Sequence, residues 1–113
     1  MAVKAVKVSG LLGVIEVHGT LMVAHEIDEL RAAITKFVNE HYTNLVIDLS
    51  GLTYLGSGAL GVFSAAHTSY AKRGWRLRFC GASEGITAIF AVSRLNRLFA
   101  MYPTREEALS GLV

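Results

Sequence analysis

One glycine-rich hexapeptide combines residue types and spacing that could bind a phosphate or a partner. Residues 56–61 are Gly-Ser-Gly-Ala-Leu-Gly, which matches the G-x-G-x-x-G pattern of dinucleotide-binding loops. In such loops the glycines let the backbone approach a pyrophosphate at the start of a helix. Ser57 could cap that helix and would be accessible to a partner. The hexapeptide is therefore the candidate functional surface.

The surroundings of the hexapeptide argue against a dinucleotide site. A dinucleotide fingerprint follows its strand at once and has an acidic residue about 20 positions further on. Here residues 51–55 separate the expected strand from Gly56, and residues 76–80 contain no acid. The chain is also too short for two mononucleotide halves and a substrate site. We therefore expect no cofactor.

The other candidate residues lack partners at catalytic or metal-binding spacing. Asp48 lies in an apolar run without an obvious acid–base partner, so we expect a structural role at a strand end, accepting loop N–H groups. Ser57 is not in a G-x-S-x-G nucleophile elbow, because the residue two positions later is Ala59. The four histidines and Cys80 lack zinc-ligand spacing. We expect neither an enzyme nor a metal protein.

Length and charge restrict the class of protein. The 113 residues suit one domain over residues 1–113, and a hydrophobic share of 52% is ample for a core. A net charge of +2 is too small to indicate nucleic acid, so the basic residues at 72–78 are interpreted as a helix end and exposed strand positions. No apolar run reaches the roughly 18 residues needed to cross a bilayer. With no leader-like N-terminus and one cysteine, we expect a cytoplasmic protein without membrane insertion.

The elements that must position the hexapeptide alternate between strands and helices. We expect strands near residues 3–8, 11–18, 45–50, 75–80 and 97–100, and helices near 24–40, 57–73, 83–90 and from 104 onward. Residues 51–55 are expected to form a short loop. Ser83 and the Thr104-x-x-Glu107 spacing predict helix caps. The order β-β-α-β-α-β-α-β-α predicts an α/β fold with a mixed, mostly parallel sheet of about five strands and about four helices.

This order of elements, together with residues 46–62 (Val-Ile-Asp-Leu-Ser-Gly-Leu-Thr-Tyr-Leu-Gly-Ser-Gly-Ala-Leu-Gly-Val), resembles the STAS family. The family includes bacterial anti-sigma factor antagonists and a domain of sulphate transporters. The resemblance covers nearly the whole chain. It implies a STAS-like fold and a non-enzymatic regulator that binds an anti-sigma factor with a serine-kinase-like fold. In such pathways the kinase phosphorylates a serine at the start of the second helix, and the unphosphorylated antagonist frees a sigma factor.

The resemblance also assigns site residues, with departures from the family pattern. Tyr54 and Leu55 match an apolar pair, and Ser57 matches the first serine, whereas Gly58 stands at the usual phosphoacceptor position. Either Ser57 is phosphorylated instead, or the protein is a binding module that is not switched in this way. The implied partner surface comprises Tyr54, Gly56, Ser57, Gly58, Ala59, Leu60, Gly61 and Ser64.

Two other functions stay open at this point. One is a sensor that binds a nucleotide or another small ligand at the helix N-terminus, where a phosphate would be favoured. The other is a subunit of a larger stress-signalling or membrane-lipid-transport complex. The sequence leaves the oligomeric state open.

Overall fold

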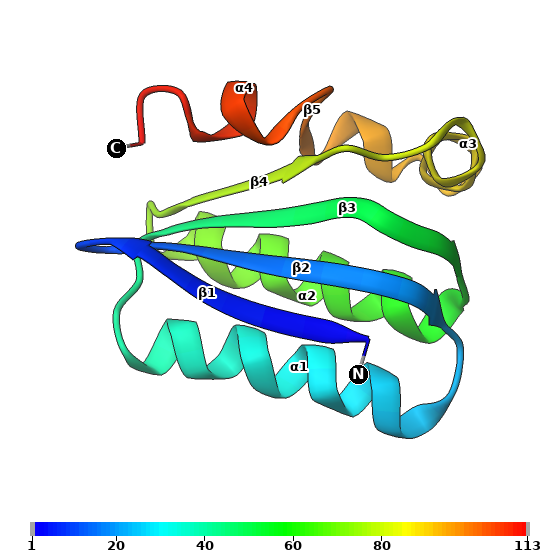
Figure 1. Cartoon of the computed structure of the whole chain (residues 1–113), viewed down its shortest axis with the longest axis horizontal. Helices are drawn as coiled ribbons and strands as arrows, with labels where there is room; N and C mark the ends of the chain where they lie inside the picture. Colours follow the sequence, from blue (N-terminus) through cyan, green and yellow to red (C-terminus); the bar gives the residue numbers. More distant parts are fainter. Residues whose placement is uncertain (1, 113) are drawn as a thin grey trace.

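Five strands form one sheet in the computed structural model, which describes residues 2–112. The sheet follows the chain order β1-β2-β3-β4-β5; β1 runs antiparallel to β2, and the other neighbours are parallel (Figure 1). The predicted mixed, mostly parallel sheet is confirmed. The strands are β1 (Val3–Ser9), β2 (Leu12–Leu21), β3 (Asn44–Leu55), β4 (Arg76–Cys80) and β5 (Ala100–Tyr102).

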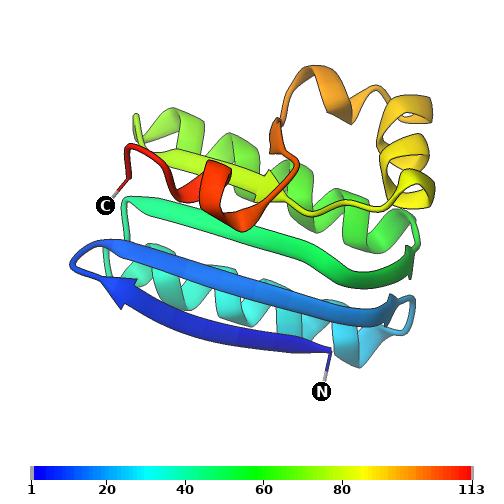
Figure 2. The same ribbon diagram turned by 45° about the horizontal axis from the view of Figure 1, so that its top comes forward.

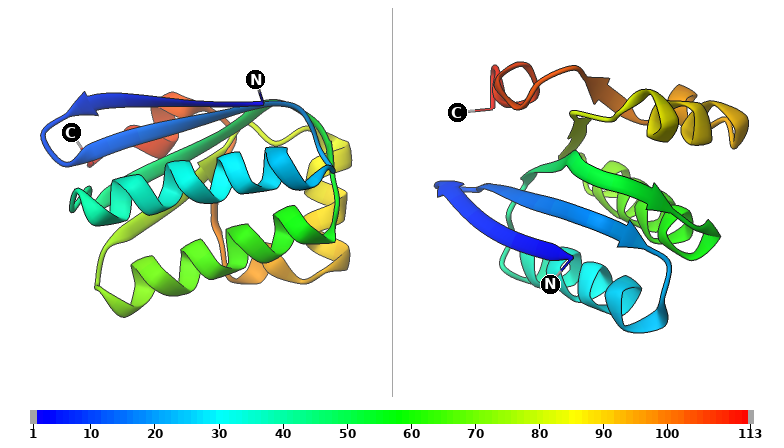
Figure 3. Two further views of the ribbon diagram at one scale, coloured as in Figure 1. Left: turned by 90° about the horizontal axis from the view of Figure 1, so that it is seen from below. Right: turned by 45° about the vertical axis from the view of Figure 1, so that its right-hand side comes forward.

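Helices cover the two faces of the sheet unequally. The two long helices α1 and α2 lie side by side on one face, and the short helix α4 lies on the other (Figures 2 and 3). Helix α3 and a 3₁₀ helix, η1, connect β4 to β5. The bounds are α1 (Ala24–Asn39), α2 (Ser57–Lys72), α3 (Glu84–Val92), η1 (Leu95–Arg97) and α4 (Arg105–Leu109).

An aromatic cluster fixes α3 and the segment before β5 against the sheet. It belongs to the core that α1, α2 and α3 form with the sheet. The rings of Phe79 and Phe99 stack with centroids 4.5 Å apart, and Phe90 of α3 meets Phe99 edge to face at 5.7 Å. Phe63 of α2 joins the cluster at 5.4 Å from Phe79. Burial of these rings stabilises the folded state, and the ring pairs have preferred geometries, so these elements are held together.

The structure corrects two of the expected boundaries. Residues 51–55 are strand, because they pair with the end of β2, where Leu21 lies beside Leu55. The register shifts beyond Glu16 and Asp48, so a β-bulge interrupts the local pattern there. The last strand is present, but its expected bounds of 97–100 are wrong: residues 95–97 form η1, and β5 begins at Ala100. The left-handed backbone of Arg94 (φ 63°) turns the chain into η1.

The predicted caps of α3 and α4 are confirmed. The Ser83 hydroxyl oxygen accepts a hydrogen bond from Ile86 N at 3.2 Å, and the Thr104 hydroxyl oxygen accepts one from Glu107 N at 3.2 Å. Each bond satisfies an N–H group that the first turn of a helix leaves unpaired. Within residues 2–112, no helix has both the length and the apolar character needed to cross a membrane.

Candidate functional site

The glycine-rich hexapeptide lies where the carboxyl ends of β2 and β3 meet. Gly56 N donates a hydrogen bond to Leu21 O at 3.0 Å, which ties the end of β3 to the β2–α1 connection. Gly56 has an extended backbone and occupies the N-cap position, and α2 begins directly after it at Ser57. The chain therefore passes from strand to helix within one residue.

Ser57 is the first helical residue of α2 and is exposed. It is not the cap: Gly56 occupies that position and has no side chain, so the capping prediction for Ser57 is wrong. The first turn of α2 contains no acidic residue. The unpaired N–H groups and the helix dipole there favour a negative charge. A phosphate on Ser57 would therefore be compatible with the helix.

One glycine of the hexapeptide lets two helices pack closely. A Cβ atom added at Gly58 would lie 2.8 Å from Cδ1 of Ile27, so this glycine allows close packing of α2 on α1. Nothing lies within 4 Å of the corresponding position at Gly61, which is exposed. Strand β3 extends to Leu55 and α2 begins at Ser57, so no loop of residues 51–55 separates them. The argument against a dinucleotide site that was based on such a loop is therefore wrong. The space at Gly58 is nevertheless occupied by Ile27, and β4 carries no acid.

Three large apolar side chains are exposed around the start of α2. Met22, Val23 and Tyr54 are each about half exposed. The Met22 sulfur would lie 3.3 Å from a Cβ added at Gly56, so Met22 packs beside the glycine. Exposed apolar side chains that lie close together are candidates for a binding surface. Sequence reasoning missed Met22 and Val23, although two consecutive apolar residues between a strand and a helix were a usable signal.

We call the exposed surface at the start of α2 the α2 corner. Some of the partner residues that the sequence implied lie on this surface, and others are buried beneath it. Ala59 is fully buried and lies beneath the surface, while Leu60 and Ser64 are partly buried on α2. The α2 corner comprises Met22, Val23, Tyr54, Gly56, Ser57, Gly58, Leu60, Gly61 and Ser64. These residues carry no formal charge, so a single phosphate would change the character of the surface.

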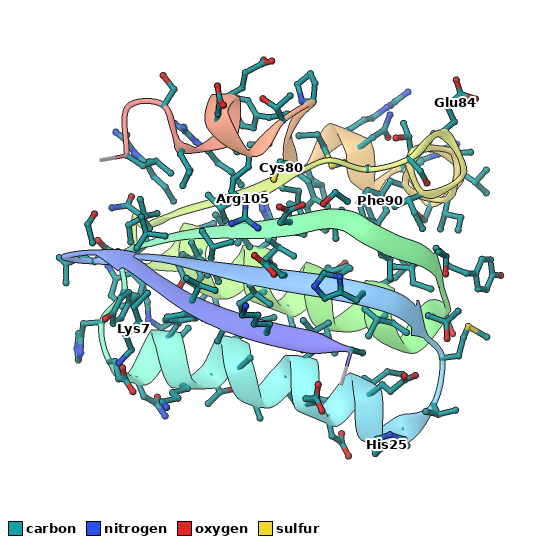
Figure 4. The ribbon with its side chains drawn as sticks, viewed as in Figure 1. Lys7, His25, Cys80, Glu84, Phe90 and Arg105 are labelled. Carbon is teal, nitrogen blue, oxygen red and sulfur yellow. The ribbon has the colours of Figure 1, made fainter. Side chains whose placement is uncertain are left out.

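A separate ionic cluster lies under α4 on the opposite face of the sheet (Figure 4). Arg105 Nε donates to Asp48 Oδ2 at 2.8 Å, and Arg105 Nη2 donates to Glu16 Oε2 at 2.7 Å. Ser50 N donates to Asp48 Oδ1 at 2.9 Å. Asp48 lies within β3 and not at its end, because the strand continues to Leu55. Sequence reasoning missed Glu16 and Arg105, which lie 89 positions apart.

The ionic cluster sets the protonation of its members. Burial alone would raise the pKa of Asp48, but the Ser50 N–H and the Arg105 guanidinium outweigh it and hold the pKa below its ordinary value. The hydrogen bond from Arg105 likewise lowers the pKa of Glu16. Cys80, buried beside Asp48, has a thiol pKa raised to about 12, mainly by burial and then by the Asp48 charge. Asp48, Glu16 and Arg105 are therefore all charged near neutral pH.

Two residues of the predicted basic cluster have intramolecular roles. Arg78 Nη1 donates to Ala108 O at 3.0 Å and to Ser110 O at 2.8 Å, which holds the end of α4. Arg73 Nη1 donates to Ser69 O at 3.0 Å. Across residues 2–112, no three His, Cys, Asp or Glu side chains come together in a way that could hold a metal ion.

Comparison with known proteins identifies the family. Protein TM1081 of Thermotoga maritima has the same fold with a TM-score of 0.83 at 18% identity, over 91% of this chain and 88% of that chain. The Bacillus anti-sigma factor antagonist SpoIIAA in its phosphorylated form matches with a TM-score of 0.79 at 20% identity, over 99% and 100% of the two chains. An anti-sigma factor antagonist of Mycobacterium paratuberculosis matches with a TM-score of 0.78 at 24% identity, over 96% and 92%. The STAS domain family model matches residues 3–108, and the chain therefore belongs to the STAS domain family.

Proposed function

We propose that this protein is a cytoplasmic, non-enzymatic anti-sigma factor antagonist, folded as one STAS domain over residues 1–113. It binds an anti-sigma factor with a serine-kinase-like fold through the α2 corner. One observation carries the proposal: Met22, Val23 and Tyr54 expose apolar surface around Ser57, which lies exposed at a helix start. The similarity of the fold to SpoIIAA, a named anti-sigma factor antagonist, supports it.

A phosphate on Ser57 would regulate docking without unfolding the domain. Phosphorylation adds about −1.5 to −2 charges at neutral pH. The N-terminus of α2 favours that charge, whereas a partner that covers Met22 and Tyr54 would have to desolvate it. Binding would therefore weaken while the helix stays formed. If Ser57 is not an acceptor, the same surface makes the protein a constitutive antagonist, since Gly58 has no hydroxyl.

The proposal is tested by affinity capture from native lysate, followed by intact-mass analysis of the recovered protein. We expect a kinase-like anti-sigma factor to be captured. A phosphate on Ser57 after incubation with ATP identifies a working switch, and the same partner without phosphate identifies a constitutive antagonist. Capture of transporter or scaffold subunits in place of a kinase-like protein would overturn the function and leave the family assignment intact.

A further inference from the structure

A second exposed surface extends from the end of α3 through η1 to Leu98. Val92 is 86% exposed and Leu98 is 58% exposed, which are high values for large apolar side chains. Arg94 and Arg97, which lie between them in the chain, are also exposed. We call these four residues the α3 corner. The buried rings of Phe90 and Phe99, which contact each other, anchor the segment on both sides.

Arg94 stands at a position whose backbone conformation favours glycine. All four α-helices are followed by a residue with positive φ: His41 (59°) after α1, Gly74 (71°) after α2, Arg94 (63°) after α3 and Gly111 (81°) after α4. Glycine adopts this conformation without the steric cost that a Cβ atom imposes. The side chain of His41 contributes by packing on Trp75, with ring centroids 6.0 Å apart. The Arg94 side chain instead is exposed to solvent.

The positive charge of the α3 corner is not balanced within the described chain. The segment from residue 85 to residue 105 contains no Asp or Glu. Among residues 2–112, no carboxylate lies within 4.0 Å of the guanidinium of Arg94 or Arg97. Apolar side chains flanked by unpaired guanidinium groups complement apolar side chains flanked by carboxylates, which arginine binds in bidentate geometry.

We propose that the α3 corner is a second docking surface, which binds a protein segment that carries apolar side chains next to Asp or Glu. A membrane is disfavoured because recognition of anionic lipid typically uses clusters of about 4–8 basic residues, and this corner has Arg94 and Arg97. The surface differs in chemistry from the α2 corner, which carries no formal charge.

The test uses a random peptide display library selected on the full chain, and the Arg94→Gly, Arg97→Gln double variant is assayed only afterwards. An enriched peptide is then labelled with fluorescein, and its affinity is measured by fluorescence polarisation. We expect enriched peptides to combine apolar residues with Asp or Glu. Arg94→Gly and Arg97→Gln should each weaken binding about tenfold, as loss of a charge-assisted hydrogen bond would. Arg94→Gly should melt at the same or a higher temperature than the parent, because it removes a strained side chain.

The controls separate this surface from the α2 corner and from lipid. Arg76→Gln, which removes an exposed arginine on β4, and Tyr54→Ala should leave the affinity unchanged. Enriched peptides without acidic residues, or with affinity that survives both arginine substitutions, would overturn the proposal. So would co-sedimentation of the parent with phosphatidylglycerol vesicles that is lost in the double variant. Loss of binding in Tyr54→Ala alone would assign the peptides to the α2 corner and refute the second surface.

Discussion

The side chains of Arg105 and Asp48 meet at 2.8 Å between Nε and Oδ2, although the residues are 57 positions apart in the chain. Arg105 is the first residue of α4, which has only five residues. A helix this short is not stable alone in water. Docking on the sheet through Arg105 and the buried Ala108 therefore holds α4 in place.

Replacing Arg105 should destabilise the protein. Arg105→Gln leaves the buried carboxylate of Asp48 without its cation. We expect a loss of about 1–3 kcal/mol, less than for a fully buried pair because the Arg105 side chain is partly exposed. Urea denaturation measures the change. Arg31→Gln removes the exposed pair with Asp28 and should cost less than about 0.5 kcal/mol. Equal losses in the two variants would contradict the structural role of the Arg105 pair.

Stability should fall in acid because of the same cluster. The folded-state pKa values of Asp48 and Glu16 lie below their ordinary values, so the unfolded chain binds more protons as the pH falls. This stabilisation is complete above about pH 5 and is lost as the pH falls through the folded pKa values. The urea midpoint of the parent should decrease from pH 5 to pH 3, and that of Asp48→Asn should decrease less. Parallel plots of the urea midpoint against pH for the parent and Asp48→Asn would show that Asp48 does not contribute to the loss of stability in acid.

Cys80 reports on the docking of α4. Burial, and then the Asp48 charge, raise the thiol pKa to about 12, so the folded protein should react slowly with a disulfide reagent at pH 8. Arg105→Gln should speed the reaction about tenfold if it loosens α4 by about 1.4 kcal/mol. Absorbance of the released thiolate measures the rate. An unchanged reaction rate in Arg105→Gln, considered together with the stability that urea denaturation gives for this variant, would mean that α4 does not control access to Cys80.

The sequence predicted the elements that local residues determine and missed those that distant residues determine. The serine and threonine caps of α3 and α4 follow from neighbouring residues, and both are present. Residues 51–55 form strand only because β2 extends to Leu21 beside them, and Gly51 hides that pairing locally. The Glu16–Asp48–Arg105 cluster joins three elements, so no spacing along the chain could indicate it.

The sequence predicted only part of the α2 corner, because some of its residues are brought there by elements that are distant in the chain. Ser57 and the glycines could be recognised from their own pattern. Met22 reaches the surface through the β2–α1 connection, and its position beside Gly56 depends on the pairing of β2 with β3. Burial of Ala59 likewise follows from packing of α2 on the core and not from the hexapeptide itself.

Gly58→Ser should place a hydroxyl at the usual acceptor position of the family. The added Cβ would meet only the flexible end of Ile27, and serine has a higher helix propensity than glycine, so stability should change by less than about 1 kcal/mol. If the captured anti-sigma factor is an active kinase, this variant should incorporate phosphate faster than the parent. Intact-mass analysis after incubation with ATP measures it. A variant that folds, binds the kinase and gains no phosphate would show that position 58 is not presented as an acceptor.

The most direct test is titration calorimetry of the captured anti-sigma factor with the parent, Ser57→Asp and Thr68→Asp. The two variants add the same charge to exposed positions of one helix, the first inside the α2 corner and the second three turns away. Docking through the α2 corner predicts that Ser57→Asp weakens binding at least tenfold, since a carboxylate would be desolvated there, while Thr68→Asp binds like the parent. Equal affinity of the parent and Ser57→Asp would contradict docking at this surface.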